Sequence, residues 1–72
     1  MSVRIHWRQT SDQGKAFSGG TSTSLDILQG MGNILGQDKI PVLRGMGKLD
    51  KFYDEVADAI ESVGEIEVWG VW

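Results

Sequence analysis

The sequence predicts a small α+β domain in which the two ends of the chain form neighbouring strands of one antiparallel sheet. Two observations favour this class. Apolar and polar residues alternate at both ends of the chain, and apolar residues recur at helical spacing in two stretches between them. The chain has 72 residues, enough for a single domain over residues 1–72 with a small core.

Three stretches have the pattern of β-strands. In residues 2–8 apolar residues alternate with polar ones, which predicts a strand with one buried face. Turn-forming residues follow at 10–14, and residues 15–18 offer a short second strand that would complete a β-hairpin. Residues 65–72 alternate in a similar way and predict a C-terminal strand.

The polar faces of the two terminal strands carry opposite charge. Arg4, His6 and Arg8 lie on the polar face of the first strand, and Glu65 and Glu67 lie on that of the last. Opposite charges across a strand pair stabilise it by about 0.2–1 kcal/mol each. We therefore expect the first and last strands to be neighbours in a mainly antiparallel sheet of two or three strands.

The first predicted helix covers residues 23–35. Residues 23–26 have the pattern of a capping box with aspartate in the place of glutamate. Apolar residues follow at helical spacing, and Gly36 is suited to the position after the last helical residue. Gly30 and Gly32 make this a weak helix, because each costs about 1 kcal/mol relative to alanine.

The second predicted helix covers residues 46–63, where a continuous apolar stripe ends at Gly64. Residues 37–47 are expected to form a connector with a short extended piece, because Pro41 disfavours helix in the residues before it. The predicted element order is ββααβ, or βααβ if the second strand is absent. Both helices are expected to cover one face of the sheet.

The composition argues against several classes of protein. No apolar run approaches the roughly 18 residues that span a bilayer, and the N-terminus lacks the apolar core of a signal peptide, so a cytoplasmic protein is expected. The formal net charge of −3 argues against nucleic-acid binding, which needs a basic surface. An enzyme is not expected, because the chain has no cysteine and no serine placed for activation by its single histidine, His6.

Acidic residues are concentrated near the C-terminus. Residues 1–48 hold six basic and three acidic side chains, whereas residues 49–72 hold one basic and seven acidic ones. Like charges four residues apart destabilise a helix by about 0.2–0.5 kcal/mol per pair. The acidic stripe of the second helix therefore calls for compensating cations, either within the chain, on Arg4, Arg8 or Arg44, or on a basic partner.

This stripe is expected to be either a solvated helix face or a contact surface for a protein. A metal site is not predicted, because hard cations take ligands from a folded loop or from several elements. Trp69 is expected on the face of its strand away from the core, where an aromatic side chain can anchor an interface. The predicted partner-binding residues are Asp50, Asp54, Glu55, Asp58, Glu61 and Trp69.

A seven-residue motif occurs twice. Residues 28–34 recur as residues 43–49, with the shared form L-[QR]-G-M-G-[NK]-[IL]. In the structural interpretation, the glycines allow close approach of another backbone and the methionine fills the gap. In the functional alternative, the second copy begins the second helix and binds an anion through its free N–H groups and cations. The residues of that alternative site are Arg44, Gly45, Gly47 and Lys48.

Taken together, these features predict a small acidic protein without catalytic activity or cofactor. It would act stoichiometrically through protein contacts, as an inhibitor or adaptor of a larger partner with a basic surface. Counter-defence proteins of viruses and mobile elements offer an analogy of size and charge. The alternative is a module that binds a phosphorylated or nucleotide-like small molecule at the second Gly-Met-Gly segment as a homodimer. Open sheet edges would also allow two copies to pair.

Overall fold

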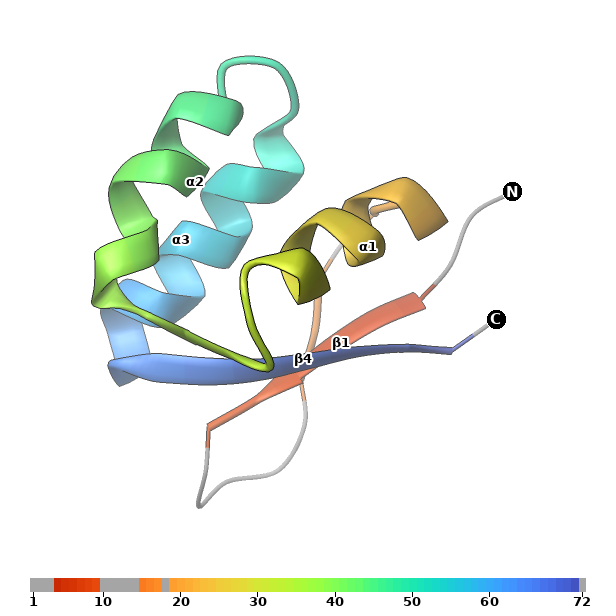
Figure 1. The fold of residues 1–72 in the computed structure, drawn as a ribbon, viewed down its shortest axis with the longest axis horizontal. Helices are drawn as coiled ribbons and strands as arrows, with labels where there is room; N and C mark the ends of the chain where they lie inside the picture. Colours follow the sequence, from red (N-terminus) through yellow and green to blue (C-terminus); the bar gives the residue numbers. More distant parts are fainter. Residues whose placement is uncertain (1–3, 10–14, 18, 72) are drawn as a thin grey trace.

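Three helices lie on one face of a four-stranded antiparallel sheet, as the computed structural model shows (Figure 1). The structure describes residues 4–9, 15–17 and 19–71. The predicted α+β class is confirmed, although the sheet has four strands instead of two or three. The strand order is β2-β1-β4-β3. The elements are β1 (Arg4–Arg8), β2 (Lys15–Ala16), α1 (Ser22–Gly30), β3 (Ile34–Gly36), the 3₁₀ turn η1 (Gln37–Lys39), α2 (Ile40–Met46), α3 (Lys51–Val63) and β4 (Glu65–Val71).

The predicted pairing of the first and last strands is confirmed. β1 and β4 are antiparallel neighbours at the centre of the sheet, with Arg8 opposite Glu67 and His6 opposite Trp69. The Arg8 guanidinium lies 2.8 Å from Glu67 Oε1, so the opposite charges on the two polar faces do meet. The residues that alternate with them along each strand face the core, as the burial of Ile5 shows.

The prediction of one helix over residues 23–35 was wrong at its C-terminal end. α1 ends at Gly30. Gly32 has a φ of 134°, a backbone conformation that residues other than glycine rarely adopt. The chain leaves the helix there and continues as β3, which pairs with the first half of β4. Leu35 of β3 is fully buried, whereas Ile34 is 52% exposed, so even this short strand alternates.

The second difference lies before α3. Residues 40–46 form α2 where a connector with a short extended piece was expected. Pro41 lies in the first turn of this helix, where a backbone N–H would have no acceptor within the helix, so its missing N–H costs no hydrogen bond. α3 then begins at Lys51 instead of residue 46. Asp50 caps this helix, since its carboxylate accepts a 3.0 Å hydrogen bond from the Phe52 backbone N–H.

The core lies between the helices and the inner face of the sheet. An aromatic chain runs through it: Trp7 stacks on Phe17, and Phe17 meets Phe52 edge-on at a centroid distance of 5.4 Å. The largest fully buried side chains come from both the helices and the sheet, and they are Ile5, Leu28, Leu35, Leu43, Val56, Ile60 and Ile66.

Among the described residues, no helix is long and apolar enough to cross a membrane.

Candidate functional site

Three carboxylates of α3 converge on one arginine of α2. The Arg44 guanidinium lies 2.7 Å from Asp58 Oδ1, 2.9 Å from Glu61 Oε2 and 3.4 Å from Asp54 Oδ1. α2 packs alongside α3, which brings Arg44 over the acidic stripe of the longer helix. Arg4, Arg8 and Arg44 were the candidate cations within the chain. Arg44 is therefore the one that compensates the negative charge of this stripe.

These hydrogen bonds raise the pKa of the Arg44 guanidinium further above its ordinary value, with Asp58 contributing most and Glu61 next. A raised pKa means that the stabilising contribution is fully present below the ordinary pKa of arginine and is lost only as the pH rises through the higher folded value. The Arg44 guanidinium therefore stays protonated at every pH at which the protein would be studied.

The Arg44 cluster keeps a negative charge at the surface. Three carboxylates face one guanidinium, and the side chains of Asp54, Asp58 and Glu61 are between 43% and 67% exposed. Exposed ion pairs contribute little to stability, with measured values of about 0–1 kcal/mol. We call the surface formed by Arg44, Asp54, Asp58 and Glu61 the acidic face.

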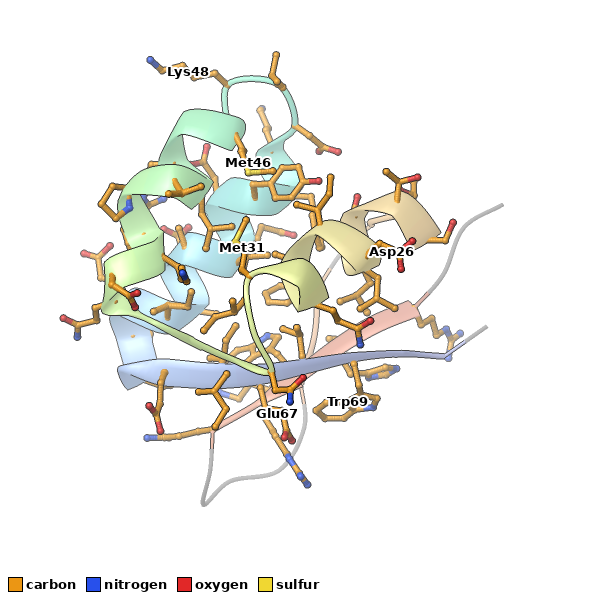
Figure 2. All side chains as sticks on the ribbon, viewed as in Figure 1. Asp26, Met31, Met46, Lys48, Glu67 and Trp69 are labelled. Atoms are coloured by element: carbon orange, nitrogen blue, oxygen red, sulfur yellow. The ribbon has the colours of Figure 1, made fainter. Side chains whose placement is uncertain are left out.

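The other predicted partner-binding residues are not among the side chains that contact Arg44. Asp50 is the N-cap of α3. Glu55 lines a hollow of about 300 Å³ together with Lys15, Trp7 and Asp58, so this hollow borders the acidic face at Asp58. Figure 2 shows Trp69 on the side of the sheet away from the helices. The six residues therefore belong to different surfaces of the molecule.

Both Gly-Met-Gly segments are the C-terminal ends of helices. Gly30 ends α1, and Gly45 lies in the last turn of α2. Met31 and Met46 each follow a fully buried leucine by three residues and pack partly buried against the core, among the helices in Figure 2. The repeated motif thus marks two helix ends whose methionines both pack against the core.

The prediction that Gly45 and Gly47 begin a helix was wrong. The C-terminal end of α2 presents carbonyl groups and the negative end of the helix dipole, both of which disfavour an anion. Arg44 is already surrounded by carboxylates, and a Cβ built on Gly47 would lie 2.5 Å from Asp54 Cγ. Lys48 points away from the molecule (Figure 2). This geometry does not favour a phosphorylated ligand at these residues.

The sheet face opposite the helices forms a second candidate surface. The Trp69 ring stacks on His6 at a centroid distance of 5.7 Å, and the Arg8 guanidinium lies 5.6 Å from the ring centre. Beside them is an open hollow of about 400 Å³ whose lining includes Asn33 and Glu67. Trp69 was expected on this outer face, whereas Asn33 and the exposed Ile34 were not, because both lie within the stretch that was predicted to be helical. The glycine at position 32, followed by alternating Ile34 and Leu35, was the available signal.

Comparison of the chain with protein-family models, with curated proteins and with solved structures found no match. Within the described residues, no group of three or more histidine, aspartate or glutamate side chains is placed to hold a metal ion. The charges and contacts of the acidic face and of the open sheet are therefore the features that bear on function.

Proposed function

We propose that this protein acts stoichiometrically by binding a larger protein through its acidic face. The observation that supports this proposal is the convergence of Asp54, Asp58 and Glu61 on the single guanidinium of Arg44. The cluster holds three negative charges against one positive charge, and all of its members reach solvent. A basic surface on a partner would supply the missing cations.

Arg44 also prepares the acidic face for binding. It restrains three flexible side chains on one stripe of α3, which lowers the conformational entropy lost when a partner binds. Each carboxylate keeps further lone pairs that can accept charge-assisted hydrogen bonds from arginine or lysine side chains. Such contacts provide orientation and a fast association rate, which suit an inhibitor or adaptor better than a catalyst.

The proposal is tested by affinity capture with wild-type protein and two variants, using a lysate of the cells that naturally produce it. Asp58→Lys reverses a charge at the centre of the acidic face. Asp26→Lys makes the same change on an exposed position of α1 and serves as the matched control. We expect Asp58→Lys to reduce recovery of the basic partner at least tenfold, and Asp26→Lys to retain it.

The captured partner is then purified and mixed with each variant. Native mass spectrometry is expected to show a complex of fixed stoichiometry that weakens as salt is raised, because screening reduces contacts between exposed charges. Equal capture by wild-type protein and Asp58→Lys, or a complex indifferent to salt, would show that the acidic face is not the contact surface. Circular dichroism confirms that each variant is folded.

A further inference from the structure

Two rows of opposite charge run side by side on the sheet face that the helices leave uncovered. Arg8 of β1 lies directly opposite Glu67 of β4, and His6 lies directly opposite Trp69. Ile34 of the neighbouring strand β3 is 52% exposed beside them, opposite Glu67. We call this surface the open sheet face, and its described members are Arg4, His6, Arg8, Ile34, Glu65, Glu67 and Trp69.

We propose that the open sheet face binds the same face of a second copy, so that the protein forms a two-fold symmetric dimer. The two charged rows lie on adjacent strands, the basic row on β1 and the acidic row on β4. A two-fold axis that lies between the two sheets, parallel to the strands and above the line between β1 and β4, places β1 of one copy over β4 of the other. Arg8 then faces Glu67 of the second copy, and Glu67 faces Arg8 of the second copy. The interface is isologous, as two-fold interfaces must be.

The same axis brings the aromatic residues together. His6 lies over Trp69 of the second copy, and each Trp69 lies over His6 of the second copy, because these residues are opposite each other within one sheet. Trp69 is only partly exposed within one copy, since His6 and Arg8 already contact its ring. A second sheet would remove the rest of the indole from water, and buried tryptophan is a frequent energetic centre of interfaces.

Charge favours a second copy over other occupants of this face. The open sheet face holds two arginines and two glutamates, so a uniformly basic or acidic partner would meet one row of like charge. The helical layer is different: residues 21–63 hold seven acidic and four basic side chains. Two copies would therefore repel each other through their helices but attract each other through their sheets.

The size of the face predicts a weak dimer. With strands about 4.8 Å apart and residues about 3.3 Å apart, the four strands and the five pairs between β1 and β4 give a face of roughly 19 by 17 Å. Two such faces would bury roughly 650 Å² in total, below the roughly 1,200–2,000 Å² of stable specific interfaces and within the class of weak, transient encounters. We therefore expect a transient dimer that forms only at high micromolar concentrations, with the two sheets aligned to within about 30°.

The test is a charge-swap experiment by sedimentation equilibrium over about 1–500 µM protein, a range that brackets the micromolar affinity expected for an interface of this size. In the dimer, Arg8→Glu brings two carboxylates face to face between the copies, and Glu67→Arg brings two guanidinium groups face to face. Each variant alone is expected to dimerise at least tenfold more weakly than wild-type protein. An equimolar mixture of the two is expected to recover dimerisation, because the glutamates of one variant then face the arginines of the other. Lys51→Glu, an exposed charge reversal on α3, is the control and is expected to dimerise normally.

The mixing step separates contacts between copies from contacts within one copy. Both single variants lose the intramolecular ion pair between Arg8 and Glu67, and mixing cannot restore it. Two results would overturn the proposal. One is a mixture that does not dimerise, and the other is a wild-type protein that is still monomeric at about 500 µM, the highest concentration tested. If either charge variant fails to fold, Trp69→Ala decides the question: weaker dimerisation supports the proposal, and unchanged dimerisation overturns it. Partner capture by Asp58→Lys does not enter this test, so the two proposals can fail separately.

Discussion

Alanine substitution of Gly45 is predicted to stabilise the protein, whereas the same change at Gly47, two residues further on, is predicted to bring no comparable gain. A Cβ on Gly45 would have no neighbouring atom within 4 Å. A Cβ on Gly47 would lie 2.5 Å from both Cγ and Oδ1 of Asp54. Neither glycine has a positive φ, so the difference between them is a matter of space.

The size of the effect at Gly45 follows from its helical position. Glycine in a helix is less stable than alanine by about 0.5–1 kcal/mol, because its unfolded chain has more conformations to lose. In a domain of this length, 1 kcal/mol shifts Tm by about 4–8 °C. Gly45→Ala is therefore expected to raise Tm by about 2–8 °C.

At Gly47 the new methyl group forces Asp54 to move. Carbon atoms at optimal contact are about 3.5–4.0 Å apart, so a separation of 2.5 Å requires a shift of at least about 1 Å. Such a shift takes the Asp54 carboxylate away from its 3.4 Å contact with Arg44. Losing this exposed contact costs about 0–1 kcal/mol and offsets the gain from replacing glycine, so Gly47→Ala is expected to leave Tm nearly unchanged.

Thermal unfolding followed by circular dichroism, at one protein concentration for all variants, measures both shifts. Gly30→Ala is the positive control, because its Cβ also has no neighbour within 4 Å at the end of α1. In an Asp54→Ala background the contact is absent, and Gly47→Ala is expected to raise Tm as Gly45→Ala does. Equal increases in Tm for Gly47→Ala and Gly45→Ala in the wild-type background would refute a spatial conflict between residue 47 and Asp54.

Three further substitutions test the fold. Asp50→Ala removes the acceptor of the Phe52 N–H and is expected to lower the free energy of unfolding in urea by about 0.5–2 kcal/mol. Asp50→Asn is expected to keep most of the cap, and equal losses of stability in the two variants would argue against capping. Ile60→Ala empties a fully buried site and is expected to cost about 2–5 kcal/mol by the same assay, with a value under about 1 kcal/mol contradicting the described core. Gly20→Ala is expected to lower Tm by more than Gly45→Ala raises it. Gly20 has a φ of 113°, and its Cβ would lie 2.6 Å from Ile5 Cδ1. An unchanged melting curve would contradict this backbone geometry.

The features that could be predicted from the sequence are those with a strict period. The outward position of Trp69 followed from alternation, because a strand with one buried face has only one register that keeps its apolar residues inside. The pairing of β1 with β4 followed from the charges on their polar faces, which meet at Arg8 and Glu67. The amphipathic part of α3 was likewise visible, since its stripe spans several turns.

The features that were missed are short and depend on their surroundings. β3 has three residues and α2 has seven, too few for either period to be distinguished from chance. Pro41 was interpreted as a signal against helix, although a proline in the first turn favours one. The contact between Arg44 and the carboxylates also depends on how α2 packs on α3, a tertiary arrangement that no local pattern encodes.

The central position of β1 and β4 in the sheet has a consequence for folding. Arg8 and Glu67 are 59 residues apart in the chain, yet they form one of the pairs on which the sheet is built. Closing so long a loop costs entropy before the strand pair can compensate for it. The middle of the sheet therefore assembles only once both of its distant strands are available, and refolding is expected to be slower than in a helical bundle of equal length.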